Sequence, residues 1–153
     1  MWFSRKQVAK APTGSGASVA GADPPSGQIT TKRLGDAAES LARAHLMRAG
    51  LVPVDANYRT PGRGGGEVDL IMRAPDGTLV FVEVRRRKSR SHGGAGASIG
   101  AIKQQRIIFA ARHYLTRWAT LPPCRFDVVL VEGEAGATGG VTVEWLQGAF
   151  DAD

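Results

Sequence analysis

Apolar and polar residues alternate along residues 67–73 and 78–85, and this pattern predicts two β-strands. Between them, Pro75-Asp76-Gly77 fits a three-residue hairpin loop with Gly77 in the left-handed bulge position. Apolar side chains occur on both sides of each strand, which indicates a sheet covered by helices. The expected faces are Val68, Leu70 and Met72 against Glu67, Asp69 and Ile71 in the first strand, and Val80, Val82 and Val84 against Leu79, Phe81, Glu83 and Arg85 in the second.

The short hairpin also predicts the register of the two strands. If Ala74 faces Thr78, then Asp69 lies opposite Glu83, and Glu67 lies opposite Arg85 in the same way. Directly opposed residues have Cβ atoms about 5 Å apart. The sequence therefore predicts two carboxylates side by side between apolar strands.

Helical spacing of apolar residues predicts a first helix over residues 32–49, with Thr30 or Thr31 as N-cap and Gly50 as its left-handed end. Glu39 shares an angular line with Gly35, Ala42 and Leu46, so it is expected to point along a small or apolar stripe. The alternative is an ordinary surface carboxylate.

A second helix is expected over residues 98–118, where Ile107, Ala111, Tyr114 and Trp118 form an apolar stripe that ends before Pro122-Pro123. Further strands are expected at 51–55, 125–132 and 141–146. The predicted order is αβββαββ in one α/β domain over residues 31–153. Residues 1–30 are expected to be a flexible tail, because 11–28 are rich in Gly, Pro, Ser and Ala.

Composition narrows the cellular setting. No apolar run reaches the roughly 20 residues that a membrane-spanning helix needs, and the first ten residues do not resemble a secretion signal. The lone Cys124 has no partner for an intrachain disulfide. We therefore expect a cytoplasmic protein with no membrane contact.

The net charge of +6 and the pI near 10.1 favour a polyanionic partner. Much of the excess lies in one run, Arg85, Arg86, Arg87, Lys88 and Arg90. Such a run also fits a solvated strand end, so charge alone leaves both interpretations open.

The expected carboxylate pair carries the candidate chemistry. Opposed like charges destabilise a sheet, and a divalent cation such as Mg²⁺ compensates them with oxygen ligands while keeping positions open for water and phosphate. Arg85 would add a fixed cation beside a bound phosphate. The alternative is an ion-pair network that joins Glu67 to Arg85 and Asp69 to Arg73.

Several motifs resemble the YraN family of bacterial proteins. They are Gly66-Glu67-Val68-Asp69-Leu70-Ile71, Leu79-Val80-Phe81-Val82-Glu83-Val84-Arg85-Arg86-Arg87, Arg125-Phe126-Asp127-Val128-Val129, and Gly35, Asp36 and Glu39 followed by Gly50-Leu51 and Asn57-Tyr58-Arg59. The resemblance covers about residues 30–150. Through that family the chain is similar to Holliday-junction resolvases and other nucleases of the PD-(D/E)xK type.

The resemblance implies a restriction-endonuclease-like core, a mixed sheet of about five strands flanked by helices. It implies that Asp69 and Glu83 are the two motif acids, that Glu39 is the acid on the first helix, and that these three bind Mg²⁺ or Mn²⁺. Arg85 stands where that superfamily usually has lysine; it keeps the charge but cannot give up its proton. The implied catalytic residues are Glu39, Asp69, Glu83 and Arg85, and the implied nucleic-acid contacts are Arg86, Arg87, Lys88, Lys103, Gln104 and Arg106.

Three functions remain open at this point. The first is a metal-dependent endonuclease that hydrolyses phosphodiester bonds, with junction or branched DNA as the expected substrate, although no residue separates DNA from RNA. The second is a catalytically silent nucleic-acid-binding protein, and the third is a protein-interaction module. Resolvases of this fold act as dimers, so a homodimer is a further expectation, with Trp118, Trp145 and Phe150 belonging either to an interface or to the core.

Overall fold

The computed structural model describes residues 30–87, 99–133 and 138–152. The expected tail, apart from Thr30, lies outside these residues, as does Lys88. The elements are α1 (Thr31–Arg48), β1 (Val52–Arg59), β2 (Glu67–Arg73), β3 (Leu79–Arg87), α2 (Ala101–Leu115), β4 (Cys124–Glu132) and β5 (Thr142–Phe150).

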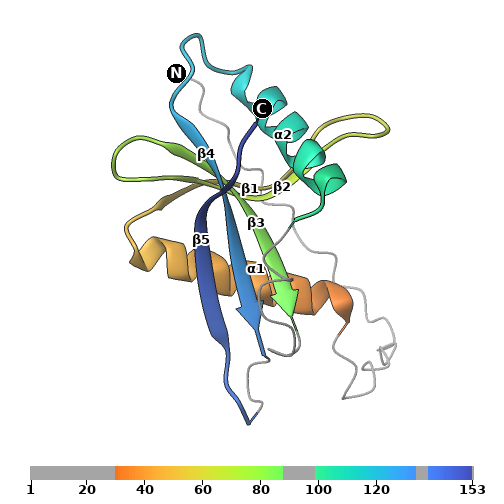
Figure 1. Cartoon of the computed structure of the whole chain (residues 1–153), viewed down its shortest axis with the longest axis vertical. Coiled ribbons are helices and arrows are strands. Elements are labelled where there is room, and N and C mark those ends of the chain that lie inside the picture. The colour runs from red at the N-terminus through yellow and green to blue at the C-terminus, as the bar shows by residue number, and fades with distance from the viewer. Residues whose placement is uncertain (1–29, 88–98, 134–137, 153) are drawn as a thin grey trace, which may run out of the picture.

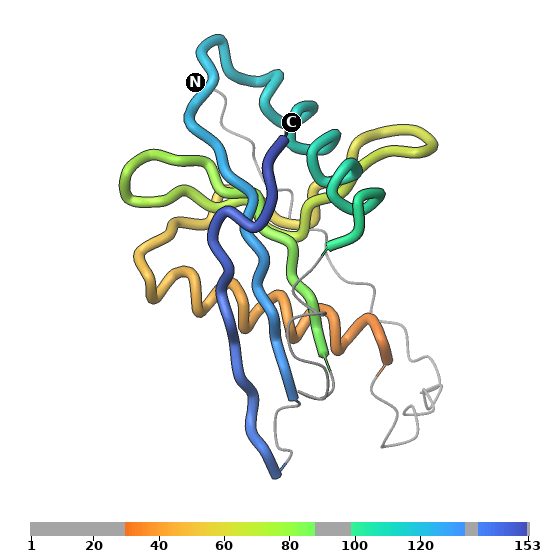
Figure 2. Tube along the Cα trace, viewed as in Figure 1, coloured from red at the N-terminus to blue at the C-terminus, as the bar shows by residue number. Residues whose placement is uncertain are grey.

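The five strands form one mixed sheet in the order β1-β2-β3-β4-β5. Strands β3 and β4 are parallel, and the other neighbouring pairs are antiparallel. Helices α1 and α2 cover opposite faces (Figure 1). The sheet is strongly twisted, so the β2–β3 hairpin lies across the direction of β4 and β5 (Figure 2). This arrangement confirms the predicted α/β class, the mixed sheet and the order αβββαββ.

Helix α1 begins and ends as its capping residues dictate. The Thr30 side chain accepts a hydrogen bond from the Arg33 backbone N–H at 3.3 Å, and Gly50 adopts a φ of 98° directly after the helix. The buried residues Ala38, Ala42 and Leu46 place the line that contains Glu39 toward the sheet. The inward orientation of Glu39 is therefore confirmed.

Helix α2 is shorter than the predicted 98–118. At its end the Thr116 hydroxyl donates to the His113 carbonyl, and the N–H of Trp118 bonds to the carbonyl of Leu115, three residues back. These bonds tighten the last turn and end the regular helix. Trp118 still packs against the core, although it lies beyond the helix.

The β2–β3 hairpin has the predicted register. The Ala74 N–H donates to the Thr78 carbonyl at 2.9 Å, and Gly77 has a φ of 90°. Pairing continues from Arg73 opposite Leu79 to Leu70 opposite Val82, where the ladder stops. The next position on each strand is Asp69 and Glu83, so the two acids stand where the strands part.

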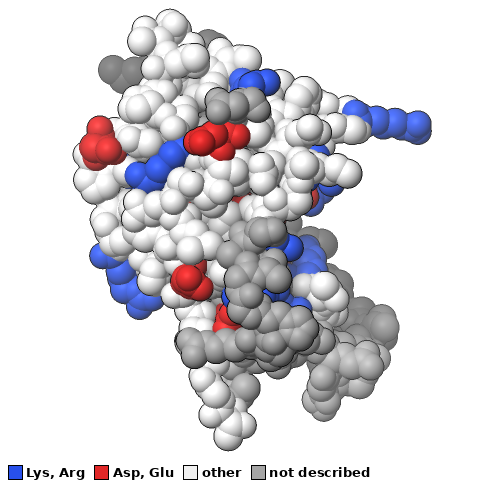
Figure 3. Space-filling model, in the orientation of Figure 1, with Lys and Arg blue, Asp and Glu red and all other residues white. Residues whose placement is uncertain are grey.

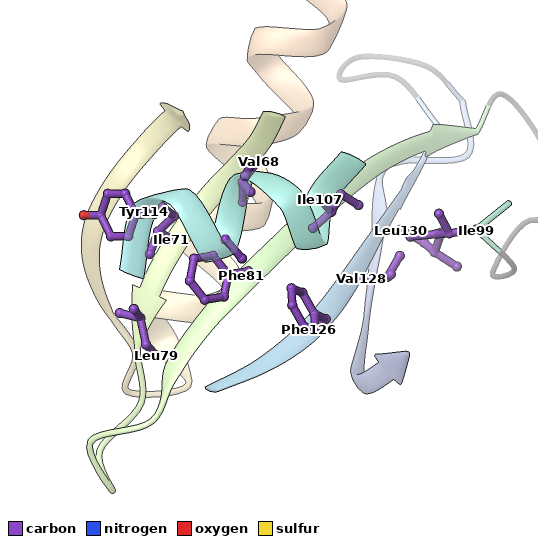
Figure 4. Close-up of a cluster of buried hydrophobic side chains, with 12 residues drawn as sticks. Val68, Ile71, Leu79, Phe81, Ile99, Ile107, Tyr114, Phe126, Val128 and Leu130 are labelled. Carbon is purple, nitrogen blue, oxygen red and sulfur yellow. The ribbon is translucent and has the colours of Figure 1, made fainter. Parts of the chain in front are cut away.

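The prediction that Val68 shares a face with Leu70 and Met72 is wrong. Val68 belongs to the cluster beneath α2 (Figure 4), whereas Leu70 and Met72 pack beneath α1. Two residues before Val68, Gly66 lies close to α2, where an added Cβ would lie 1.9 Å from the Arg106 carbonyl oxygen. This contact holds the start of β2 directly under the helix.

Two strands are longer than predicted. Strand β1 continues past Asp55 to Arg59, with Asn57 at a φ of 51°, and β5 continues to Phe150. A register irregularity between Phe126 and Val128 lets β5 continue.

Asp127 fixes that irregularity from inside the sheet. It is fully buried and accepts hydrogen bonds from the Arg125 Nε, from the Trp145 Nε1 at 2.9 Å and from the Gly148 N–H at 3.0 Å. These protein donors satisfy the Asp127 carboxylate, as expected for a residue that stabilises the fold. Trp145 and Phe150 pack against the two clusters as partly buried core residues. No helix in the described ranges is long and apolar enough to cross a membrane.

Candidate active site

Asp69 and Glu83 form the centre of the site at the fork between β2 and β3. An Asp69 oxygen accepts a hydrogen bond of 2.8 Å from the Val84 backbone N–H, which fixes the carboxylate against β3. Glu83 is only 7% exposed. The predicted neighbouring carboxylates are therefore present.

Burial and the Asp69 charge together raise the pKa of Glu83 to about 8, although Lys103 pulls it down. One Glu83 oxygen, Oε2, is buried and has no hydrogen-bond partner within the described structure. A buried carboxylate oxygen without a donor is costly, and either a proton or a cation relieves that cost. Glu83 is therefore poised to take up one or the other.

Lys103, from the first turn of α2, contacts Glu83 and its neighbour Glu67. Its Nζ lies 3.2 Å from Glu67 Oε1 and 3.5 Å from Glu83 Oε1. Burial alone would lower the pKa of Lys103, but Glu83, Glu67 and Asp69 outweigh it and raise that pKa. Sequence reasoning assigned Lys103 to nucleic-acid contact and missed this position, because only the fold brings residues 67, 83 and 103 together.

Glu67 does not face Arg85 as the hairpin register suggested. Its partners are Lys103 and the Arg59 Nε at 3.5 Å, because β2 and β3 have separated at this point. Burial raises the pKa of Glu67, but Lys103, Arg59 and Arg106 outweigh it and lower that pKa.

Glu39 approaches the centre from α1. Burial raises its pKa first, and the charge of Asp69 adds to the rise. When the Asn57 amide is oriented so that its nitrogen faces Glu39, this nitrogen donates hydrogen bonds to both Glu39 carboxylate oxygens, at 3.2 and 3.3 Å. Glu39 and Asn57 line a hollow of about 220 Å³ that also includes Asp36 and Arg43. Asn57 belongs to the motif Asn57-Tyr58-Arg59, but no pattern in the sequence predicted its place beside Glu39.

The predicted metal ligands are only partly assembled. Among residues 30–87, 99–133 and 138–152, no three acidic, histidine or cysteine side chains converge closely enough to hold a metal ion together. Mg²⁺ needs only one or two protein carboxylates, with water and phosphate as the remaining ligands. Asp69 and Glu83, whose Oε2 has no partner among the described residues, fit such an ion. Glu39 is instead hydrogen-bonded to Asn57 when the Asn57 amide is flipped.

The other predicted residues have different surroundings. Arg85 and Arg86 lie half-buried on β3, opposite Leu130 and Val131 of β4. Arg87 forms an ion pair of 2.6 Å with Glu132 and is mostly buried. Basic and acidic side chains are interspersed on the face in Figure 3.

At the start of α2, two further predicted contacts differ in exposure. The Gln104 amide nitrogen donates to the Ile99 carbonyl at 2.8 Å, so this side chain supports its own helix. Arg106 is exposed, one turn from Lys103 on the same helix. Of the two, Arg106 is free to meet a ligand.

Comparison with known proteins places this fold and site in a family. The profile of the "Uncharacterised protein family UPF0102" matches residues 38–131, more than half of the chain. The chain is 66% identical to a "UPF0102 protein" of Polaromonas naphthalenivorans over 99% of both chains, and 64% identical to one of Paracidovorax citrulli over 82% of this chain and 87% of that one. The chain belongs to the UPF0102 family, which confirms the predicted YraN membership.

Proposed function

We propose that this protein is a divalent-metal-dependent nuclease that hydrolyses phosphodiester bonds in nucleic acid, with branched or junction DNA as the expected substrate. The observation that carries the proposal is the buried Glu83 Oε2, which lacks a partner beside the Asp69 carboxylate. This arrangement is unfavourable for a protein on its own and favourable for one that binds a cation.

The chain's residues divide the work as follows. Asp69, held by the Val84 N–H, and Glu83 would hold Mg²⁺ or Mn²⁺. A bound ion of this kind lowers the pKa of a coordinated water and stabilises charge on the phosphate. Hydrolysis then forms a bond from the water oxygen to phosphorus and breaks one phosphorus–ester oxygen bond. Glu39, whose pKa is raised by burial and by the Asp69 charge, would take the proton of the water.

Lys103 supplies the cation that Arg85 was expected to provide. Its ammonium contacts Glu83 and Glu67. With Glu83 engaged in holding such an ion, the Lys103 ammonium would be available to pair with a phosphate oxygen. Lysine is a compact charge on a flexible stem, so it adapts to this exchange better than a planar guanidinium.

One observation favours a second function, a nucleic-acid-binding protein without catalysis. The Lys103 ammonium lies 3.2 Å from Glu67 and 3.5 Å from Glu83, so a side chain of the protein itself offsets these two acids. This alternative predicts salt-sensitive binding of nucleic acid that survives the loss of Asp69 and Glu83, since phosphate contacts depend on Lys and Arg.

A cleavage assay separates the two functions. Labelled linear, flapped and four-way DNA is incubated with wild type, Asp69→Asn, Glu83→Gln and the control Asp151→Asn, an exposed acid near the C-terminus. We expect cutting only with Mg²⁺ or Mn²⁺, lost in the two site variants and retained in the control. No metal-dependent cutting by wild type, or equal cutting by Asp69→Asn, contradicts the proposal.

A further inference from the structure

A second hollow borders the acid cluster on the side of the glycine-rich loop, residues 60–66. This loop hollow has a volume of about 230 Å³, and its walls are the loop glycines, Arg59, Arg106 and Glu67. Glu67 also contacts Lys103, which in turn contacts Glu83. Glu67 therefore lines the hollow and is also linked, through Lys103, to Glu83 at the fork between β2 and β3.

The loop is held in place by close packing. Thr60 closes its neck: its N–H donates to the Gly66 carbonyl at 3.0 Å, and its Oγ1 accepts from the Gly66 N–H at 2.7 Å. A Cβ at Gly65 would lie 2.2 Å from Thr60 Oγ1, and one at Gly66 would lie 1.9 Å from the Arg106 carbonyl oxygen. Both glycines are required by this contact, so the hollow is preformed where the loop meets α2.

The loop carries unused hydrogen-bond donors. In the described part of the chain, the backbone N–H groups of Gly62, Gly64 and Gly65 donate to no protein acceptor. Gly62 and Gly64 have φ values of 90° and 70° on either side of Arg63. Left-handed residues placed among ordinary ones turn successive N–H groups toward one side, and such concave arrangements bind anions.

Arg106 brings an unpaired positive charge to the same wall. It is exposed, and among the described carboxylates none lies within ion-pair distance of its guanidinium. Arg59, the other basic residue of the hollow, makes a single contact of 3.5 Å with Glu67 and is 78% exposed. A planar guanidinium can bind phosphate through two parallel hydrogen bonds.

We propose that the loop hollow binds a backbone phosphate of the same nucleic-acid strand whose scissile phosphate lies at Asp69 and Glu83, with Arg106 as its main cation. This inference rests on the proposed function, and it adds how the strand is positioned. A phosphate held in the loop hollow fixes the strand along the wall formed by Glu67. The bond at the acids is then selected by its distance along the backbone and not by base identity.

Binding measured without cleavage tests this site. Fluorescence anisotropy of labelled single-stranded and branched DNA, in EDTA over a range of salt, compares wild type with Arg106→Gln and the matched control Arg73→Gln, an exposed arginine at the far end of β2. Loss of one phosphate contact lowers the slope of log K against log salt by about 0.7 for single strands and 0.9 for duplex. We expect that change for Arg106→Gln, partial recovery in Arg106→Lys, and no change for Arg73→Gln.

Neutral methylphosphonates placed singly along the oligonucleotide identify the contacted phosphate. At one position the substitution should weaken wild type and leave Arg106→Gln unaffected. If wild type binds DNA but Arg106→Gln has the same salt slope as wild type, and both respond alike to the methylphosphonate at every position, the loop-hollow site is wrong and the nuclease proposal stands. If wild type does not bind nucleic acid at all, both are wrong. Binding with the Arg106 effect but no metal-dependent cutting overturns the catalytic proposal, and with it the placement of a scissile phosphate at the acids, and leaves only the phosphate contact of the loop hollow.

Discussion

The Asp69 carboxylate accepts a hydrogen bond of 2.8 Å from the backbone N–H of Val84, the residue that follows Glu83 on the neighbouring strand. This bond holds one acid of the site against the strand that carries the other. It forms where the β2–β3 ladder stops, after Leu70 and Val82, so the strands part without separating their acids. The fork is thus the structural element that builds the site.

The first prediction concerns pH. The pKa of Glu83 is about 8 in the fold and 4.5 ordinarily, so between these values the folded chain holds a proton that the unfolded chain has released. The Glu83 contribution to stability is present below about pH 4.5 and is lost as pH rises through about 8, with a slope of at most about 1.4 kcal/mol per pH unit. Denaturant melts from pH 5 to 9 should show this decline in wild type and not in Glu83→Gln. Equal slopes would show that Glu83 ionises normally.

The second prediction concerns Lys103. In Lys103→Gln the ammonium no longer offsets Glu67 and Glu83, so the metal-free protein should melt at lower temperature than wild type near pH 8. The rise in melting temperature on adding Mg²⁺ should be larger than in wild type, because no ammonium competes with the ion. Lys32→Gln, an exposed change on α1, is the control. A smaller Mg²⁺ effect in Lys103→Gln would mean that Lys103 supports the ion instead of taking its place.

The third prediction separates Asp127 from the acids of the site. Asp127→Ala leaves the Trp145 Nε1 and the Gly148 N–H without an acceptor in the core, and we expect a loss of about 3 kcal/mol in unfolding free energy. Asp151→Ala should change little. The rise in melting temperature on adding Mg²⁺ should be the same for the folded Asp127→Ala protein as for wild type. A variant that folds normally but loses the metal response would place Asp127 in the site.

The fourth prediction compares two glycines. Gly66→Ala places a Cβ 1.9 Å from the Arg106 carbonyl oxygen and 2.9 Å from the Ala110 nitrogen, so β2 and α2 must move apart. We expect a marked loss of stability. Gly35→Ala meets nothing within 4 Å and lies inside α1, so it should raise the unfolding free energy by about 1 kcal/mol. Denaturant melts of both variants check the pair, and a Gly66→Ala as stable as wild type would contradict the described contact.

Local sequence patterns predicted what local physics decides. The hairpin Pro75-Asp76-Gly77 was enough to place Asp69 beside Glu83, because a turn of that length admits few registers. Capping residues predicted the ends of α1 to within one residue, and the angular spacing along the helix predicted that Glu39 points toward the sheet. Family membership followed from the same motifs.

Contacts between distant segments were not predictable in this way. Lys103 on α2 reaches Glu83 on β3 through the packing of the helix on the sheet, and no spacing along the chain encodes that packing. Val68 was assigned to the wrong face because strict alternation along a strand does not account for the twist of the sheet beneath α2. The contact between Asn57 and Glu39 and the free N–H donors of the loop hollow could be identified only from the folded backbone.

The most direct test of the metal proposal is anomalous diffraction from crystals soaked in Mn²⁺. The account predicts one anomalous peak at the fork, about 2.0–2.3 Å from oxygens of both Asp69 and Glu83, with Lys103 displaced from Glu83. The same soak of Glu83→Gln should give no peak. A wild-type crystal without a peak at the fork, and with Lys103 still bound between Glu67 and Glu83, would contradict the account.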